Sequence, residues 1–167
     1  LRRWREAFEG ITVGQVLVTR QDLEHAVTAG LFCESIHAVW DYAALPIVNE
    51  NDAVSTEEIS FGDNDRLAAE VAAALGAEKL VILTDQEGIL EAFGTPQQRR
   101  LETVAVDAVD GHIHPSRSAF GKGGASSKVE AARVALTAGV EVFVAHAATP
   151  HSVEDVLSGK NGTKIIQ

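Results

Sequence analysis

The sequence predicts an α/β fold built on a mostly parallel sheet, and three observations support this prediction. Apolar runs that suit strands alternate with helix-period segments at least three times along the 167 residues. Residues 79–84 contain the run Leu-Val-Ile-Leu, which is apolar at every step, as in a strand covered by helices on both faces. Residues 63–75 place Leu67, Val71 and Leu75 on one face of a helix.

The chain before residue 63 is predicted to form a strand, a helix and a second strand. The two strands are expected at residues 15–19 and 45–48, with Pro46 near the start of the second. Between them, residues 22–44 have apolar side chains at spacings of three, four and five. This mixture favours a helix but leaves room for an interruption near Gly30.

The second half of the chain begins with the helix over residues 63–75, for which Asp63 suits the N-cap and Gly76 suits the C-terminal stop. Further elements follow the strand at residues 79–84. They are a strand at 101–106 within an irregular stretch, a helix at 126–138 with a capping box at Ser127 and Glu130, a strand at 140–145, a short helix at 152–157 and a strand at 164–166.

Composition limits the classes of function. The formal net charge is −10, which argues against sequence-independent nucleic-acid binding, because that needs a basic surface. No apolar run approaches the roughly 18–20 residues that span a bilayer, and no secretory signal opens the chain. The lone Cys33 cannot form an internal disulfide, so a reducing cytoplasm is the expected compartment. The sequence starts at Leu1 without a methionine, and we expect a fragment of a longer protein.

Two polar clusters flank one short loop. The first is Asn-Glu-Asn-Asp at residues 49–52, after the strand at 45–48, and the second is Gly-Asp-Asn-Asp at 62–65, which opens a helix. Ligands of open α/β sheets bind outside the carboxyl ends of strands, where such side chains can meet a small polar substrate. Either cluster alone is explained equally well as turn and cap residues. Two clusters around one loop favour a binding site.

A glycine-rich stretch precedes the helix predicted at residues 126–138. Residues 121–128 read Gly-Lys-Gly-Gly-Ala-Ser-Ser-Lys, and a loop of this kind can aim backbone N–H groups at an anion. The stretch lacks the spacing of a P-loop, and Ser126 stands where a dinucleotide-binding fingerprint needs its last glycine. Taken alone, it is better explained as a flexible turn before a capped helix.

Other polar residues give weaker signals. Thr84 and Asp85 end the most hydrophobic strand, where they can meet a nucleotide or cap the next turn. His112 and His114 would share one face of a strand, but no acidic or cysteine partner has a metal-ligand spacing. Cys33 lies in a helical pattern and suits a small core residue.

Four segments together resemble the glutamate 5-kinases, a family of the amino acid kinase superfamily. They are Leu-Pro-Ile-Val-Asn-Glu-Asn-Asp at 45–52, Phe-Gly-Asp-Asn-Asp at 61–65, Leu-Thr-Asp-Gln-Glu-Gly at 83–88, and the loop at 123–128. The resemblance runs from about Gln15 to the C-terminus. The first two segments are specific to this family, whereas the glycine loop is shared across the superfamily. The sequence departs from the family pattern at Lys122 and Ala125, where threonine and methionine are usual, and residues 91–120 match loosely.

The resemblance implies a three-layer αβα sandwich that is incomplete at the N-terminus. Residues 1–167 would be the C-terminal portion of an amino acid kinase domain, without the RNA-binding-like domain of some members. The implied reaction transfers the γ-phosphoryl group of ATP, with Mg²⁺, to the side-chain carboxylate of L-glutamate, in the first step of proline synthesis. The implied protein is a cytoplasmic homo-oligomer with no nucleic-acid or membrane partner.

The resemblance also implies roles for individual residues. Asp52 and Asn64 would bind glutamate, Asp65 would position the catalytic lysines, and Lys128 would stabilise the transition state. The ATP site would consist of Thr84, Asp85, Lys122, Gly123, Gly124, Ala125, Ser126, Ser127 and Lys128. No residue is assigned as a metal ligand.

The chemistry of this reaction agrees with the residues present. A glutamate carboxylate has a pKa of about 4.3 and is ionised at neutral pH, so no general base is needed. Catalysis then rests on positioning and on neutralising phosphoryl charge. Two alternatives stay open: an N-acetylglutamate or aspartate kinase, and a non-catalytic nucleotide-binding fragment that acts with a partner chain. Because the family has a second phosphate loop upstream, we expect residues 1–167 alone to have little kinase activity and to self-associate.

Overall fold

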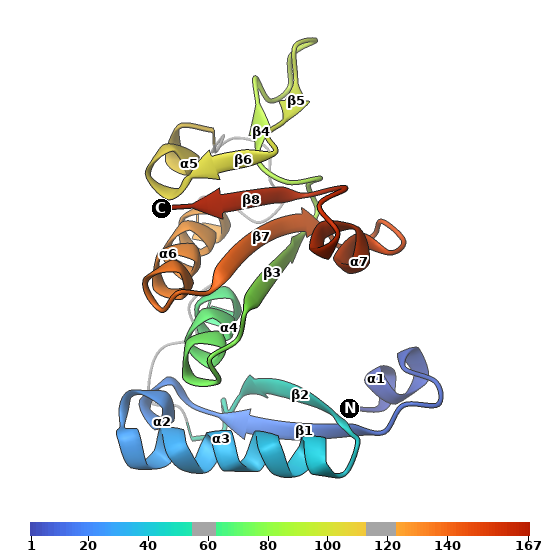
Figure 1. Cartoon of the computed structure of the whole chain (residues 1–167), viewed down its shortest axis with the longest axis vertical. Coiled ribbons are helices and arrows are strands. Elements are labelled where there is room, and N and C mark those ends of the chain that lie inside the picture. The colour runs from blue at the N-terminus through green and yellow to red at the C-terminus, as the bar shows by residue number, and fades with distance from the viewer. Residues whose placement is uncertain (55–62, 113–122) are drawn as a thin grey trace. The chain divides into compact units, whose positions relative to one another are not determined.

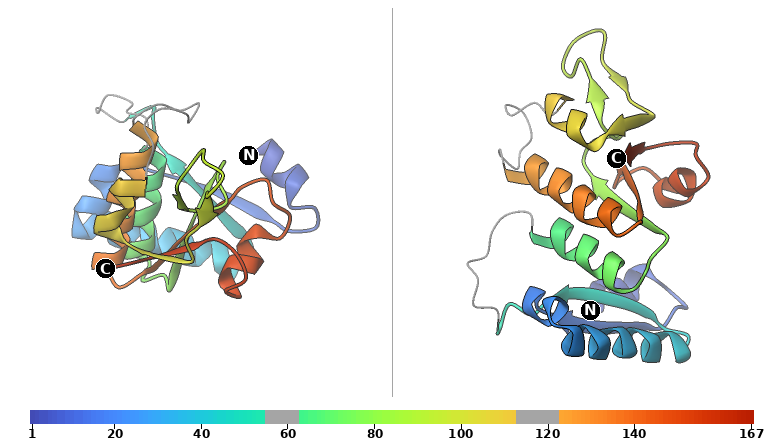
Figure 2. Two further views of the ribbon diagram at one scale, coloured as in Figure 1. Left: turned by 90° about the horizontal axis from the view of Figure 1, so that it is seen from above. Right: turned by 60° about the vertical axis from the view of Figure 1, so that its left-hand side comes forward.

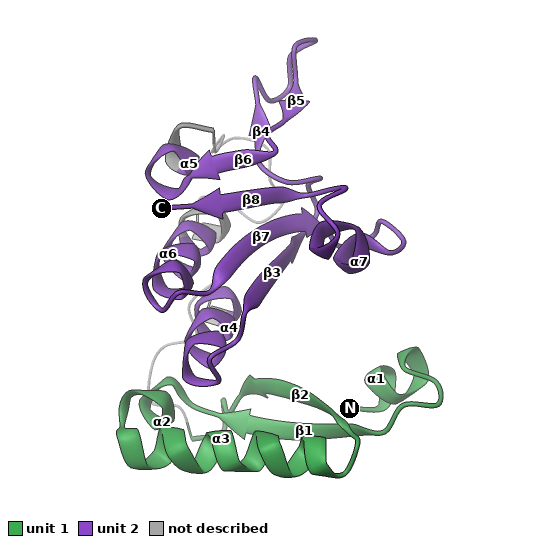
Figure 3. Ribbon diagram, in the orientation of Figure 1, with its two compact units in different colours: residues 1–59 green, residues 60–167 purple. Residues whose placement is uncertain are grey.

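The computed structural model describes residues 1–54, 63–112 and 123–167. Their contacts form two compact units, residues 1–59 and residues 60–167 (Figure 3). The expectation that residues 1–167 are one portion of an amino acid kinase domain is not tested by this division and stays a prediction.

The first unit is a helix followed by a β-α-β arrangement. Its elements are α1 (Arg2–Ala7), β1 (Val13–Val18), α2 (Arg20–Glu24), α3 (Ala26–Asp41) and β2 (Leu45–Glu50). The strands β1 and β2 pair in parallel, and α3 packs against both. The helix lies so close to β1 that a Cβ atom on Gly14 would be 3.0 Å from Cγ1 of Val39. Glycine therefore allows this close approach of helix and strand.

The structure corrects three details of the first unit. The helix predicted at residues 22–44 is two helices, and the break falls at His25 rather than near Gly30, which lies inside α3. The extended backbone of His25 ends the first helix. The strand β2 continues through Glu50, so the first polar cluster begins on the strand instead of after it. The helix α1 was not predicted.

The start of α2 is held by a capping box. The Thr19 hydroxyl accepts from the backbone N–H of Asp22 at 3.2 Å, and the Asp22 carboxylate accepts from the backbone N–H of Thr19 at 2.8 Å. The Thr19 hydroxyl also donates to that carboxylate at 2.7 Å. These hydrogen bonds hold the pKa of Asp22 below its usual value.

Replacing Thr19 by Ala is expected to destabilise the first unit by about 1 kcal/mol at pH 7. Because the pKa of Asp22 is lowered by folding, its contribution is present above about pH 4 and is lost as the pH falls through the folded-state pKa. The difference between wild type and variant should therefore shrink at pH 3. Urea denaturation followed by tryptophan fluorescence measures it, because Trp4 and Trp40 both lie in this unit. Equal differences at both pH values would contradict the prediction, and Ser35→Ala, which removes an exposed mid-helix hydroxyl, is the control.

The second unit has a four-stranded sheet in the order β3-β7-β8-β6 (Figure 1). The elements are α4 (Asp63–Ala74), β3 (Lys79–Thr84), β4 (Leu90–Glu91), β5 (Arg99–Arg100), β6 (Thr103–Ala105), α5 (Val106–His112), α6 (Gly123–Thr137), β7 (Glu141–His146), α7 (Ser152–Leu157) and β8 (Thr163–Ile166). The pairs β3–β7 and β6–β8 are parallel, whereas β7–β8 is antiparallel. The predicted α/β class with a mostly parallel sheet is confirmed.

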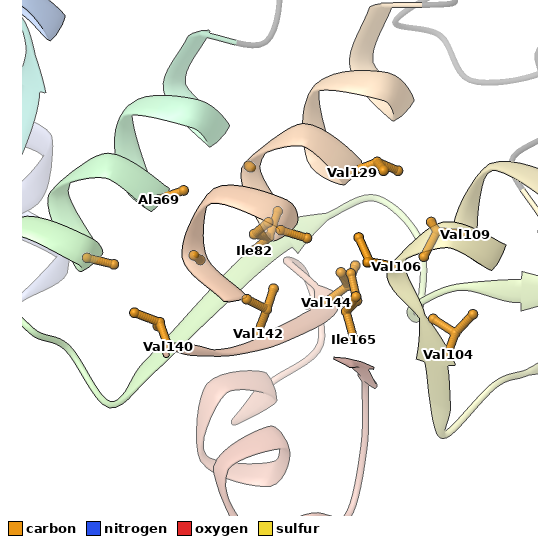
Figure 4. Packing of buried hydrophobic residues seen from close by; sticks show 14 residues of the cluster. Ala69, Ile82, Val104, Val106, Val109, Val129, Val140, Val142, Val144 and Ile165 are labelled. Carbon is orange, nitrogen blue, oxygen red and sulfur yellow. The ribbon is translucent and has the colours of Figure 1, made fainter. Parts of the chain in front are cut away.

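The core of the second unit lies between the sheet and the helices α4 and α6 (Figure 4). The strand β7 is in the middle of the sheet, and its Val142, Val144 and Ala145 are buried on both faces. The strand β3 was predicted to be covered on both faces, but Leu83 is 45% exposed. This difference arises because β3 is an edge strand of this sheet.

The structure also corrects several helix boundaries in the second unit. The helix α6 begins at Gly123, so Ser127 is inside the helix and does not form the predicted capping box with Glu130. Asp63 is the first helical residue of α4 rather than the residue before it. The predicted strand at residues 101–106 is shorter, and α5 follows it directly. His112 therefore ends a helix and not a strand, while His114 lies outside the described residues.

The chain connections place the starts of α4 and α6 at the edge of the second unit where β3 and β7 end. Short links join the end of α4 to the start of β3 and the end of α6 to the start of β7. Each helix is therefore antiparallel to the strand that follows it. Because β3 and β7 are parallel, the N-termini of α4 and α6 lie side by side at the edge where both strands end (Figure 2).

Candidate functional site

The central feature of the site is an ion pair between the first turn of α4 and the second turn of α6. Lys128 Nζ lies 2.7 Å from Asp65 Oδ2, although the residues are 63 positions apart in the sequence. The two side chains are 26% and 21% exposed, so the pair is shielded but reachable from solvent. Asp65 is the third residue of α4 and Lys128 is the sixth of α6, and the packing of these two helices brings them together.

The Asp65 carboxylate accepts a second hydrogen bond from α6. Ser127 Oγ donates to the same Oδ2 atom at 3.3 Å. An ammonium group has three N–H donors, and the contact with Asp65 uses one of them. Asp65 therefore fixes the direction of the Lys128 side chain while leaving the ammonium able to contact an anion. The N-termini of both helices add positive partial charge at this place.

A second set of ion pairs joins the same two helices. Arg66 Nε donates to Glu70 Oε1 at 2.9 Å within α4, and Arg66 Nη1 also pairs with Glu130 of α6. Arg66 follows Asp65 directly, and Glu130 lies two residues after Lys128. This network was not predicted, because nothing in the sequence relates residues 66 and 130.

The carboxyl ends of β3 and β7 form the neighbouring part of the edge. Thr84 Oγ1 donates to Asp85 Oδ1 at 3.1 Å, and the backbone N–H of Ala147 donates to the Thr84 carbonyl at 2.7 Å. The register partner of Thr84 is His146, whose Nδ1 lies 2.9 Å from Thr149 Oγ1. His146 was missed in the sequence, although it ends a buried apolar run in the same way as Thr84.

The other predicted site residues are placed as follows. Asp52 is exposed beyond β2 in the first unit, and Asn64 is the exposed second residue of α4 in the second unit. The two units are described separately, so this predicted glutamate-binding pair stays a prediction. Lys122 lies outside the described residues. The backbone of residues 123–126 (Gly123, Gly124, Ala125 and Ser126) forms the first turn of α6, ahead of Lys128.

A divalent cation at this edge would depend on a small protein donor set. Within residues 1–54, 63–112 and 123–167, no three His, Cys, Asp or Glu side chains gather as a metal site. Mg²⁺ bound with a nucleotide keeps several waters and needs only one or two carboxylates besides the phosphates. The exposed carboxylate of Asp85 fits that requirement.

In the same described residues, none of the helices is long and apolar enough to cross a membrane.

Comparisons with known proteins point to one family. The model of the amino acid kinase family matches residues 4–146. A glutamate 5-kinase of Serratia proteamaculans is 40% identical over 166 residues, which cover 96% of this chain and 45% of the relative. A glutamate 5-kinase of Salmonella arizonae is 39% identical over 171 residues, which cover 98% of this chain and 47% of that relative. This chain thus spans about half the length of the curated relatives it matches.

Solved structures show the same fold. Carbamate kinase from Giardia lamblia bound to AMP-PNP has a TM-score of 0.58 and 26% identity, over 80% of this chain and 44% of that one. UMP kinase from Ureaplasma parvum has a TM-score of 0.60 and 14% identity, over 94% of this chain and 61% of that one. At this lower identity the likeness concerns the fold alone.

Proposed function

The chain belongs to the amino acid kinase family, and on this premise we propose that it forms the nucleotide side of a glutamate 5-kinase. The reaction transfers the γ-phosphoryl group of ATP to the side-chain carboxylate of L-glutamate. A carboxylate oxygen forms a bond to the γ-phosphorus, the bond to the β,γ-bridging oxygen breaks, and ADP leaves with those electrons. No proton has to move, because the attacking carboxylate is already ionised at neutral pH.

The observation on which the proposal rests is the Asp65–Lys128 pair at 2.7 Å between two helix N-termini. Phosphoryl transfer depends on positioning and on stabilising charge that spreads over the phosphoryl oxygens. A lysine aimed by a carboxylate, beside two helix N-termini, supplies that charge in a fixed direction. Lys128 would contact the phosphoryl oxygens, and Asp65 would keep it in place. The backbone N–H groups of residues 123–126 would hold the phosphates in the ground state.

Thr84 and Asp85 are proposed to line the nucleotide site at the carboxyl end of β3. Mg²⁺ would neutralise phosphate charge when bound, and the exposed carboxylate of Asp85 would help to hold it. The similarity to a carbamate kinase that binds AMP-PNP supports a nucleotide at this fold.

Glutamate as the acceptor is supported by the two relatives at about 40% identity and by the two polar clusters. Asp52 has the charge to bind the ammonium group of a free amino acid, and Asn64 can donate or accept a hydrogen bond. An N-acetylated acceptor has no ammonium group for Asp52 to bind. The acceptor preference therefore distinguishes glutamate 5-kinase from the N-acetylglutamate kinases.

The test is an acceptor assay on a hybrid enzyme. Residues 1–167 replace the matching segment of the Serratia proteamaculans glutamate 5-kinase, and the acyl phosphate is trapped with hydroxylamine. We expect product with glutamate, and far less with aspartate or N-acetylglutamate. A hybrid that melts cooperatively but prefers N-acetylglutamate would overturn the proposal, as would one that hydrolyses ATP without any acceptor dependence.

Asp52→Ala in the hybrid is expected to raise the KM for glutamate at least about thirtyfold, because removing one partner of an ammonium–carboxylate contact that substrate binding buries costs roughly 2–5 kcal/mol. The Kd for ATP should stay within about twofold, because ATP has no group that needs this carboxylate. Steady-state kinetics and calorimetry measure the two constants. Asp41→Ala removes the same charge from the exposed end of α3 and is the matched control. An unchanged KM would remove Asp52 from the site.

A further inference from the structure

The hydroxyl of Thr163, at the start of β8, forms hydrogen bonds with two segments that are distant in the sequence, at Ile89 and at Leu101. Its side chain is fully buried, and its Oγ1 accepts a hydrogen bond from the backbone N–H of Ile89 at 2.9 Å. The same hydroxyl donates to the Leu101 carbonyl at 2.5 Å. The Leu101 N–H in turn donates to the Ile89 carbonyl at 2.9 Å. One buried hydroxyl therefore joins both ends of the excursion over residues 89–101, which contains β4 and β5.

Gly88 completes this arrangement, which we name the Thr163 junction (Gly88, Ile89, Leu101 and Thr163). The φ angle of Gly88 is +145°, a conformation that favours glycine, and a Cβ atom there would lie 2.4 Å from Thr163 Oγ1. The guanidinium of Arg100 donates to the Gly162 carbonyl, which adds a further hydrogen bond between the residues that precede Leu101 and Thr163. A side chain at position 88 would displace the hydroxyl that holds Ile89.

The Thr163 junction lies at the edge of the sheet where β3 and β7 end. Thr163 pairs with Val144 in the antiparallel β7–β8 ladder, two residues before the end of β7. Gly88 follows Asp85 by three residues. The segment 85–88 is thus held at its start by β3 and at its end by the junction.

We propose that Thr163 is a positioning residue for nucleotide binding. Its hydroxyl holds the Ile89 N–H and so fixes the backbone of the segment that begins at Asp85, directly after Thr84. This inference rests on the proposed function, in which Thr84 and Asp85 line the nucleotide site. Because the Thr163 side chain is fully buried, it would act through Ile89 and not through the substrate. The loss of its hydroxyl removes the partner of a partly buried N–H and of a partly buried carbonyl.

The hydroxyl is tested in the 167-residue chain by Thr163→Val, which keeps the shape, and Thr163→Ser, which keeps the hydroxyl. We expect the valine variant to exchange the Ile89 amide hydrogen about tenfold faster and to raise the Kd for ATP about tenfold, the upper range for one hydrogen bond. The serine variant should restore both values to within about threefold of wild type. Thr137→Val is the matched control, since the Thr137 hydroxyl donates to the backbone carbonyl of Arg133 within α6.

A second pair of variants keeps the test valid should Thr163→Val fail to fold. Gly88→Ala adds a Cβ atom that would collide with the Thr163 hydroxyl. Gly94→Ala also adds a Cβ atom to a residue with positive φ, +76°, but no other atom would lie within 4 Å of it. Only Gly88→Ala should weaken ATP binding and speed exchange at Ile89. Gly94→Ala controls for the backbone conformation alone.

The outcomes separate this inference from the proposed function. A Thr163→Val chain with fast exchange at Ile89 but wild-type ATP affinity overturns the positioning role. Equal losses in Thr163→Val and Thr163→Ser also overturn it, because they indicate packing and not the hydroxyl. A wild-type chain with a protected Ile89 amide that binds no ATP overturns the proposed function, and the nucleotide role of the Thr163 junction with it.

Discussion

Replacing Lys128 by Ala is expected to lower the kcat of the hybrid enzyme by at least about a hundredfold, while the Kd for ATP rises by less than about tenfold. The backbone N–H groups at the start of α6 can hold the phosphates before reaction. The ammonium of Lys128 should matter most as charge shifts onto the phosphoryl oxygens, and such an interaction changes kcat more than binding. Turnover at saturating ATP and glutamate, together with calorimetry of ATP binding, measures the two effects.

Two further variants make the test of Lys128 specific. Lys160→Ala removes the same charge from an exposed position near the end of α7 and should leave kcat unchanged. Asp65→Asn keeps the shape of the carboxylate but weakens its hold on Lys128, so we expect a smaller loss of kcat than for Lys128→Ala. A Lys128→Ala enzyme that keeps its kcat and loses ATP affinity would make Lys128 a binding residue only.

Replacing Ile165 by Ala is expected to reduce the free energy of unfolding of the second unit by about 2–5 kcal/mol. Ile165 is 1% exposed and lies in β8, between β7 and β6. A domain is stable by only about 5–15 kcal/mol in total, so this variant should be close to unfolding at 37 °C. Urea denaturation followed by far-ultraviolet circular dichroism measures the loss, because both tryptophans lie in the first unit.

The neighbouring residue is the control for this prediction. Ile166 is 41% exposed, and Ile166→Ala makes the same chemical change one position along β8. Since less apolar surface is removed from the core, we expect a loss below about 1 kcal/mol. Equal losses at the two positions would show that β8 is not buried as described.

The elements predicted most accurately have strong local patterns. The bounds of β3 and α7 agree with the structure, because an uninterrupted apolar run and a short helical period mark them in the sequence. The helix α4 ends one residue earlier than predicted, and Gly76 follows with φ +61°. Its C-terminal stop was therefore predicted correctly from a single glycine.

The start of α6 shows where local preference fails. Gly123 and Gly124 predict a loop, since each glycine costs roughly 1 kcal/mol in a helix compared with alanine. In the structure both residues are helical, and Ala131, Ala132 and Ala135 of the same helix are completely buried. The packing of this helix against α4 and the sheet outweighs the preference of two residues in its first turn.

The resemblance to the glutamate 5-kinases singled out Asp65 and Lys128, and their roles in the reaction stay predictions. Their distance of 2.7 Å follows from the packing of α4 on α6, which the sequence alone does not show. Arg66, His146 and Thr163 were missed, because their partners lie in segments that no local pattern connects to them. Contacts across elements are decided by the fold, and a single sequence shows them only where a family motif happens to include both partners.

The most direct test of the nucleotide site is a titration of the isotopically labelled 167-residue chain with MgATP, followed by nuclear magnetic resonance. The site described here predicts saturable shifts, at or below about 1 mM ATP, in the amides of residues 123–128 and 84–89. Glutamate added alone to the same concentration should shift none of these amides. No saturable shift with MgATP in a folded sample, or shifts confined to residues away from the start of α6 and the end of β3, would contradict the site.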